Sequence, residues 1–577
     1  MIVLGSAVMG GLSAFLALAF SLTIFSPGFL GQILLSVIVW LLVGTVFFFA
    51  LIRGVKRSAF LKVLLSPPSD IFRTFRGFIL AFSLLFPFSL IASLHLKEFI
   101  QILSRGQTYS LVEWAVPLIG AGSTVLAFTV IIGLLVALLA FVRSPRIAQR
   151  LEGLPDGYYI AVILAAAIVV RIFFIYYVNT RPVSDFFNIN SDALRVLQGE
   201  RPQNIYASTH IAITYLYAFL YGVLGPDLLV VKLFHGFIYG FSAIFMYYAG
   251  KDTFENKGWA GISALMLAFW PSLAMYSNVP TPEHMFIFFV CALLFLVSRL
   301  SKRRGQTWDG TALLIFGLIG TLLGLAGWFR PFGELFLAAL AVAVLAYRTD
   351  RRRVLVNITG LLAAFLLFSF FGRMQVDMAE SFRKDFPNVR PCNLLVGMNI
   401  DTFGQYNAED GVLCREVRNT SANSQEFNRE IIQIVLERLH DRRDALLPFF
   451  VQKFEILWRN SNGIIFWTVK LEPGADEGRA IALAQYANLA DFALMFLGTL
   501  TCLLGLLIGF FRDVKPPVLF SLLAFTAFNL VEVIFEVQTR YRTVVMPLFI
   551  FFACWTFASL ASHTQKKDDQ LVELRQS

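Results

Sequence analysis

Apolar runs of about the length needed to cross a bilayer recur along almost the whole chain and leave little of it for a soluble fold. A helix needs about 20 apolar residues to cross the hydrocarbon core, where only helices and closed barrels satisfy their backbone hydrogen bonds. About fifteen runs approach or exceed this length in the 577 residues. Hydrophobic residues make up 57% of the chain and charged residues only 15%, against about 25% charged in soluble domains. The sequence therefore predicts an all-α polytopic membrane protein.

The candidate spans and the basic clusters between them predict an orientation, because Lys and Arg collect in cytoplasmic loops. The candidate spans are residues 5–25, 32–52, 78–96, 116–141, 158–178, 211–224, 228–249, 259–276, 285–297, 311–329, 332–346, 354–371, 489–511, 517–535 and 544–561. The basic clusters are Arg53/Lys56/Arg57, Arg143/Arg146/Arg150, Lys251/Lys257, Arg299/Lys302/Arg303/Arg304, Arg348/Arg351/Arg352/Arg353, Arg512/Lys515 and Lys566/Lys567. Because these cytoplasmic clusters explain the formal net charge of +10, the charge does not indicate a nucleic-acid partner.

One of these runs must fail to cross for the orientation to be consistent. Crossings counted from Arg150 place the loop at 179–210 outside, and crossings counted back from Arg303 place Glu283 outside as well. The two placements agree only if one intervening run does not span. The run at 211–224 is short and ends in glycines and a proline, so we expect it to be a partial or interfacial element. About fourteen spans then remain, with both termini inside.

The spans and polar segments predict six regions. These are an N-terminal four-helix membrane module at 1–142, a cytoplasmic linker at 143–157, a membrane core at 158–372 with an external loop at 179–210, an extracytoplasmic loop domain at 373–487, C-terminal membrane helices at 488–562 and a cytoplasmic tail at 563–577. In the large external region, 425–447 has an apolar stripe at helical spacing. The stretch at 449–467 carries three charged residues, which favours an external or interfacial helix over a span.

The five cysteines show no metal-ligand spacing. Cys291, Cys502 and Cys554 lie in apolar runs, where packing is the expected role. Cys392 and Cys414 share the large external region. They can pair if that region faces an oxidising compartment, and the sequence leaves this open.

Ionisable groups gather on the predicted outer side. Asp185 and Asp192 lie seven residues apart in the first loop of the core, which places both carboxylates on one face if the segment is helical. Acidic groups beside a membrane are costly to dehydrate, so function is a common reason for them. The other outer candidates are His210, Glu283, Arg330, Glu334, Glu532, Glu536, Arg540, Tyr541 and Arg542.

Carboxylates and arginines beside a bilayer suit one chemistry. A carboxylate can act as general base on an acceptor hydroxyl, and guanidinium groups bind a phosphate leaving group with bidentate geometry. A lipid-phosphate donor would hold its phosphate at this depth, with its tail in the bilayer.

Each candidate also has a structural interpretation. Asp192 can be a solvated helix residue, Glu283 can cap the next helix, and Arg330 can mark a helix junction. Arg540 and Arg542 can be interfacial anchors. For His210 and His284, a structural or solvated role is favoured over catalysis.

Six short motifs resemble the GT-C superfamily of glycosyltransferases that use polyprenyl-phosphate sugars. The similarity is strongest to family 39-like bacterial proteins, relatives of the protein O-mannosyltransferases and of the lipid A aminoarabinose transferase. The motifs are PVSD at 182–185 with Ala193, LG at 224–225 before the helix with Lys232, WPSLAMYS at 270–277 leading into TPE at 281–283, GWFRP at 327–331, GMNIDTFGQYN at 397–407 and QTRYRTVVMP at 538–547. They extend from residue 158 to about 560.

The resemblance implies a GT-C-like bundle with an external active site. It implies that Asp185 is the catalytic base, that Glu283 positions the acceptor or the base, and that Arg540 and Arg542 handle the lipid phosphate. Asp192, His210, Arg330, Glu536 and Tyr541 complete the expected substrate-binding set.

Two departures from the family pattern limit what carries over. The mannosyltransferases have an Asp-Glu pair where Phe186 follows Asp185 here, and their His-Pro-Pro-Leu stretch is reduced to His210-Ile-Ala-Ile. The sugar, the acceptor and a catalytic role for His210 are therefore not implied. Because the first loop has no Asp-x-Asp, we expect no cofactor and no metal requirement, although a divalent ion stays possible.

The expected function is transfer of a sugar from a polyprenyl-phosphate donor to a hydroxyl of a glycan, lipid or protein, with inversion, outside the bacterial cytoplasmic membrane. A flippase or exporter of lipid-linked sugars is an alternative, kept open by Asp491 and Glu532 within apolar runs. A polymerase or ligase of whole lipid-linked glycans is another.

Overall fold

The computed structural model describes residues 145–203, 207–302, 310–347, 358–372, 390–459, 461–508 and 514–560, with a few positions between 87 and 95. The expected N-terminal module, apart from those positions, and the expected tail lie outside the described residues. Within them every regular element is a helix, and the single bridge between Thr180 and Leu471 is the one pairing of extended backbone.

Six described helices are long and apolar enough to cross a membrane. They are α7 (Asp156–Val178), α10 (Leu228–Phe254), α13 (Glu283–Lys302), Thr311–Phe329 of α14 (Gly310–Phe329), Glu477–Leu503 of α22 (Glu477–Ile508) and Thr539–Leu560. Shorter apolar helices are α9 (Ala207–Leu224), α11 (Lys257–Phe269), α15 (Gly333–Tyr347), Ile358–Gly372 and α23 (Pro516–Glu532). The described part of the chain is thus all-α, and its long apolar helices are those of a membrane protein.

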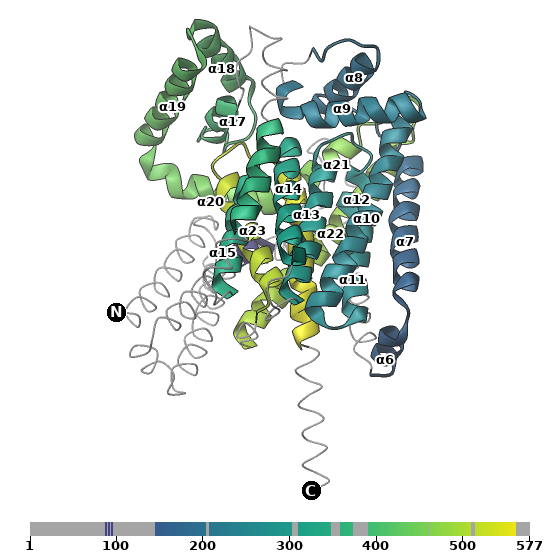
Figure 1. Cartoon of the computed structure of the whole chain (residues 1–577). Coiled ribbons are helices and arrows are strands. Elements are labelled where there is room, and N and C mark those ends of the chain that lie inside the picture. Colours follow the sequence, from purple (N-terminus) through teal and green to yellow (C-terminus); the bar gives the residue numbers. More distant parts are fainter. Residues whose placement is uncertain are drawn as a thin grey trace, which may run out of the picture.

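The remaining elements are short or polar. They are α6 (Pro145–Gly153), α8 (Asp185–Leu197), α12 (Pro271–Tyr276), α17 (Arg390–Gly397), α18 (Ala408–Thr420), α19 (Ser424–Asp441), η1 (Arg443–Ala445), α20 (Leu446–Trp458), α21 (Asn462–Thr468) and η3 (Thr539–Val545). In Figure 1, α8 and α9 lie across one end of the bundle, α17–α19 stand at that same end, and α6 lies at the opposite end.

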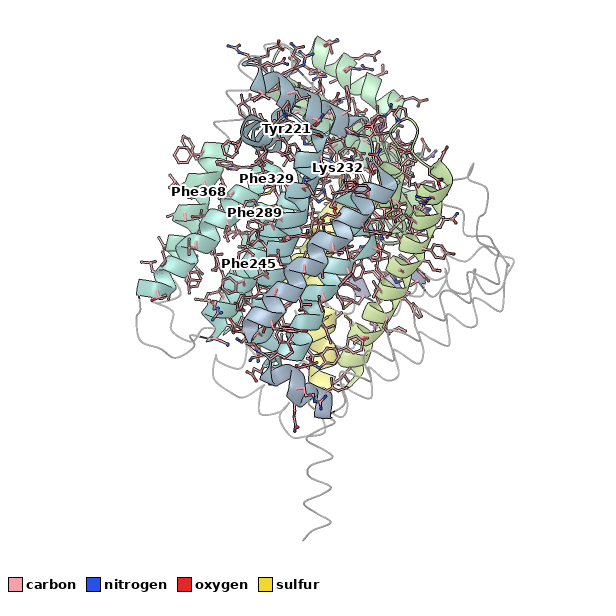
Figure 2. All side chains as sticks on the ribbon, turned by 90° about the vertical axis from the view of Figure 1, so that its right-hand side faces the viewer. Tyr221, Lys232, Phe245, Phe289, Phe329 and Phe368 are labelled. Atoms are coloured by element: carbon pink, nitrogen blue, oxygen red, sulfur yellow. A yellow bond between two sulfur atoms is a disulfide. The ribbon has the colours of Figure 1, made fainter. Side chains whose placement is uncertain are left out.

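Close helix packing builds the bundle. Helix α10 packs against α7, α11 and α13, and α14 packs against α13. Figure 2 shows Phe245, Phe289 and Phe329 at successive levels between these helices. Gly320 of α14 faces the carbonyl of Leu361 so closely that a Cβ would collide with it. Because lipid offers no hydrophobic drive for association, such close contact supplies much of the packing energy.

The expected span at 259–276 is interrupted. Helix α11 ends at Phe269 and α12 starts at Pro271, which has no N–H to continue the helix. The free end of α12 is capped from α22, because the Asp491 carboxylate accepts hydrogen bonds from the Ser272 N–H at 3.0 Å and the Ser461 hydroxyl at 2.7 Å. Asp491 therefore braces a helix junction inside the bundle.

The polar region forms a small helical subdomain on the bundle. Helix α19 matches the amphipathic helix expected at 425–447, with Phe427, Ile431 and Val435 of its stripe buried. It ends six residues earlier than expected. Cys392 of α17 and Cys414 of α18 form a disulfide, which answers the question that the sequence left open. The single helix expected at 449–467 is two helices, α20 and α21.

Candidate active site

A cavity of about 1060 Å³ lies at the end of the bundle that carries α8 and the α17–α19 subdomain. Its walls come from the start of α8, the C-terminal end of α14, α17 and α18, the junction of α20 with α21, and residues 536–541. Segments distant in sequence therefore meet around one cavity. Of the expected site residues, Asp185, His210, Arg330, Glu536, Arg540 and Tyr541 line it.

Asp185 is the first residue of α8 and faces the cavity. The preceding Ser184 has φ of 55°, a left-handed conformation that is uncommon outside glycine, and it turns the chain from the end of α7 into α8. Negatively charged side chains are stabilising at a helix N-terminus. The Asp185 side chain is 35% exposed and its Oδ2 lies 3.7 Å from Nη2 of Arg540. A carboxylate is thus available to a ligand in the cavity.

Arg540 is buried, yet not all of its N–H donors have hydrogen-bond partners. Its side chain is 7% exposed, and its Nε–H has no hydrogen-bond partner among the described residues. Three aromatic rings surround the guanidinium, at 5.0 Å for Phe186, 5.2 Å for Trp467 and 5.2 Å for Tyr541. Cation–π contacts hold the group in place without occupying its N–H donors. Arg540 therefore presents a fixed guanidinium to the cavity with donor capacity to spare.

Glu283 and Arg330 form a second ion pair beside the first. Glu283 is fully buried at the start of α13, where its carboxylate pairs with Arg330 and also accepts from the Thr281 hydroxyl. It does not itself line the cavity, whereas Arg330 does. Burial opposes the charge on Arg330, but Glu283 outweighs it and holds the pKa of Arg330 above its ordinary value. Glu283 thus has two roles: it holds Arg330 in place by an ion pair, and it places a negative charge at the N-terminus of α13.

Three further expected residues complete the cavity wall. Burial lowers the pKa of His210 to about 3, so its ring is neutral at physiological pH and does not supply a positive charge to the cavity. Burial raises the pKa of Glu536, whose Oε1 accepts from the amide of Gln538. Tyr541 lies under the guanidinium of Arg330, 5.5 Å from ring to Cζ.

The segment that carries Glu536 is fastened to the subdomain. The Glu536 N–H donates to Asn393 O at 3.1 Å. The ammonium group of Lys453, which is fully buried, donates to Phe535 O at 2.7 Å and to Gly397 O. The two sides of the cavity are therefore linked through backbone carbonyls.

Two expected residues lie elsewhere. Asp192 shares α8 with Asp185, but it is buried and accepts from the Gln203 N–H at 2.9 Å, away from the cavity. Arg542 is 1% exposed and donates to Leu457 O at 3.1 Å, to Arg459 O and to the Ser461 hydroxyl at 2.7 Å. It satisfies the C-terminal carbonyls of α20, a favourable place for a cation.

Several cavity residues were not expected from the sequence. They are Phe186, Trp467, Gln538, Tyr406, Arg415, Arg418 and Arg459. Phe186 and Trp467 matter most, since they cradle Arg540. Their neighbours in sequence carry no periodic or spacing signal that separates them from ordinary packing residues.

No known protein-family model matches the chain, and no curated protein matches it either. The resemblance to the GT-C superfamily thus rests on the motifs alone. Within the described residues, no group of three or more His, Cys, Asp or Glu side chains is arranged to hold a metal ion; metal independence stays a prediction.

Proposed function

We propose that this protein is a membrane glycosyltransferase of GT-C-like architecture that moves a sugar from a polyprenyl-phosphate donor to an acceptor hydroxyl. The observation that carries the proposal is the Asp185–Arg540 pair in a large cavity at one end of a membrane bundle. A base and a phosphate-binding group are the two parts that such a transfer needs.

The donor phosphate is expected to bind Arg540. The buried Nε–H lacks a partner among the described side chains, and a phosphate oxygen would supply one. The same phosphate competes with Asp185 for the guanidinium, so donor binding loosens the 3.7 Å pair and releases the carboxylate. Arg330 and Arg540 both lie beside the Tyr541 ring, at 5.5 Å and 5.2 Å from its centroid, so Arg330 adds a second positive charge there.

Transfer then proceeds as an in-line displacement. The acceptor oxygen forms a bond to the anomeric carbon of the sugar while the bond from that carbon to the phosphate oxygen breaks. The acceptor proton passes to Asp185, and the bonding electron pair leaves with the phosphate. The growing negative charge on the leaving group is stabilised by the fixed guanidinium of Arg540. The products are an inverted glycoside and polyprenyl phosphate.

We expect the lipid tail to leave the cavity past Gly327, near the C-terminal end of α14. Gly324 of α14 and Gly372 of the neighbouring helix line the same part of the cavity, but a Cβ on either would collide with Phe368 or Trp328, so the two helices are in close contact there. These residues lie at the apolar ends of two helices that enter the bilayer in the proposed topology. A built Cβ on Gly327 meets no atom within 4 Å, so the space there is open.

We place the cavity outside the cytoplasm. The disulfide between Cys392 and Cys414 belongs to its wall, and disulfides persist in oxidising compartments. The proposed topology of fourteen spans with both termini inside puts the same end of the bundle at the extracytoplasmic face of a bacterial cytoplasmic membrane.

The two residues that kept the transport alternative open, Asp491 and Glu532, both have another role or position. Asp491, which the sequence left as a candidate for a central path, is occupied in capping α12 and in bonding Ser461. Glu532 is buried close to Arg330 and Glu536, at the cavity end of the bundle. Both residues thus fit the architecture of the site better than a conduit along the membrane normal.

The purified protein in proteoliposomes tests the proposal with a panel of radiolabelled undecaprenyl-phosphate sugars and a membrane-lipid and glycan extract as acceptor. The expected result is time-dependent release of undecaprenyl phosphate with label in an acceptor. Movement of intact donor between leaflets without any transfer would overturn the proposal in favour of a flippase. Transfer of whole glycans but of no single sugar would favour the ligase alternative.

A further inference from the structure

Behind the cavity lies a buried set of polar side chains that the proposed reaction does not use. Tyr217 of α9, His235 and Tyr239 of α10, and His284 of α13 are each at most 1% exposed. The two imidazole rings lie 4.2 Å apart between centroids. The cost of burying so many polar atoms requires hydrogen-bond partners, and these partners are backbone carbonyls of one loop.

That loop is the connection from α12 to α13. His235 Nδ1 lies 2.7 Å from Ser277 O, and His284 Nε2 lies 3.0 Å from Val279 O. A carbonyl oxygen only accepts, so each of these ring nitrogens carries the proton. The tautomers are therefore opposite: His235 is protonated on Nδ1 and His284 on Nε2.

The remaining ring nitrogens accept from tyrosines. The Tyr217 hydroxyl lies 2.9 Å from His235 Nε2, and the Tyr239 hydroxyl lies 3.3 Å from His284 Nδ1. Because burial favours the neutral rings, each tyrosine donates its proton to the ring it faces. Tyr217 also lies 3.3 Å from Thr281 O, a longer contact that its single proton cannot serve at the same time.

The loop held in this way delivers the second ion pair of the site. Four residues after Ser277 comes Thr281, whose hydroxyl bonds Glu283, and Glu283 fixes Arg330 at the cavity wall. Thr281 and Pro282 line the cavity themselves. A shift of this loop therefore moves Arg330 relative to Arg540.

We infer that His235 and His284 are positioning residues, each relaying a tyrosine hydrogen bond through a defined tautomer to a carbonyl of the Ser277–Val279 turn. They act on the reaction through the loop and Arg330, without touching substrate. The inference rests on the proposed function only for its effect on activity, since the hydrogen bonds to the loop do not depend on it.

Amide substitutions test the tautomers directly. An Asn side chain places its N–H₂ near the position of Nδ1, and a Gln side chain near that of Nε2. We therefore expect His235→Asn and His284→Gln to keep the bond to the loop. The exchanged pair, His235→Gln and His284→Asn, aims the amide away from it and leaves a buried carbonyl unsatisfied. At each of the two positions, the Asn and Gln variants differ by one methylene.

Two readouts separate the inference from the proposed function. In hydrogen–deuterium exchange of the intact protein in detergent, the peptide covering 275–285 should exchange like wild type in the matched amides and at least about tenfold faster in the exchanged ones. In sugar transfer, the exchanged amides should lower kcat about 10- to 100-fold, the scale of a small misplacement, with the donor KM within about threefold.

The outcomes are distinct. Equal exchange rates for Asn and Gln at both positions would overturn the inference, whatever the activity. The expected exchange pattern in a protein that transfers no sugar from any donor would uphold the inference and reject the proposed function. If both amides unfold the protein at one position, as judged by size-exclusion chromatography, Tyr217→Phe and Tyr239→Phe give the same test, because each removes the donor to one ring; unchanged exchange in both would overturn the relay.

Discussion

Arg540 and Arg542 lie two residues apart, and the structure assigns them different roles that substitution can separate. Arg540 faces the cavity, and its Nε–H has no hydrogen-bond partner among the described residues. Arg542 instead donates hydrogen bonds to Leu457 O, Arg459 O and the Ser461 hydroxyl. We expect Arg540→Ala to abolish donor use in a stable protein. We expect Arg542→Ala to lower stability, with activity lost only in proportion to the folded fraction.

The contacts set the magnitudes. A hydrogen bond to a charged group contributes about 1.5–3 kcal/mol, so two bonds from Arg540 to a phosphate amount to about 3–6 kcal/mol, or a loss in kcat/KM for the donor of about 140- to 20,000-fold. Loss of the partly exposed pair with Asp185 costs stability about 0–1 kcal/mol, and loss of the contacts with the three aromatic rings adds about 0.5–2 kcal/mol. Arg542→Ala instead removes three hydrogen bonds from a charged donor, to Leu457 O, Arg459 O and the Ser461 hydroxyl, at about 1.5–3 kcal/mol each.

The assay combines thermal unfolding in detergent with initial rates of transfer over a range of donor concentrations. Arg540→Lys is the companion variant, because it keeps the charge but not the planar fork; it should recover only part of the lost donor use. The reasoning fails if Arg540→Ala and Arg542→Ala show the same ratio of lost stability to lost activity. It also fails if Arg540→Ala raises the acceptor KM and leaves the donor KM unchanged.

Three other predictions follow from the cavity. Gly327→Leu should fill the open space expected for the lipid tail and raise the KM for a long-chain donor at least about tenfold. Gly317→Leu, on the same helix and equally free of contacts for a Cβ, should not; equal effects would show that the tail does not pass Gly327. Because the pKa of Glu536 is raised, lowering the pH from neutral should protonate it, remove a negative charge beside the donor phosphate and lower the donor KM. Glu536→Gln should abolish that pH dependence, and an unchanged profile would count against it. Replacing Cys392 and Cys414 by Ser should lower the unfolding temperature by several degrees, since the bond closes a loop with a sequence separation of 22 and such loops contribute about 3 kcal/mol; free reaction of both thiols with a maleimide in the unreduced wild type would show that they do not pair.

Within the described residues, the sequence predicted the long apolar helices well because a helix that crosses the bilayer needs a minimum apolar length. Apolar length alone located α7, α13 and α14 to within a few residues. Interruptions within the apolar helices were harder to predict. Pro271 interrupts one apolar run with no change in hydropathy, and the cap that stabilises the break comes from Asp491, more than two hundred residues away.

The candidate site was predicted only in part, because sequence spacing indicates side-chain directions only within one helix. Asp185, Arg330 and Arg540 were expected together, and all three line one cavity. Spacing on a helix predicts direction only locally, however. Asp192 lies on the same helix as Asp185 but bonds a loop N–H instead, and Arg542 turns away because the segment is a 3₁₀ helix that packs on α20. The aromatic cradle of Arg540 joins three separate segments, which pairwise spacing does not encode.

The most direct test of the central claim is the transfer rate of Asp185→Asn at saturating donor, measured beside Asp192→Asn as the matched control on the same helix. General base catalysis contributes about 100- to 10,000-fold, and the account predicts a loss of that order for Asp185→Asn with donor binding retained. It predicts near wild-type rates per folded molecule for Asp192→Asn. A wild-type rate in Asp185→Asn, or equal losses in the two variants, would contradict the assignment of Asp185 as the base.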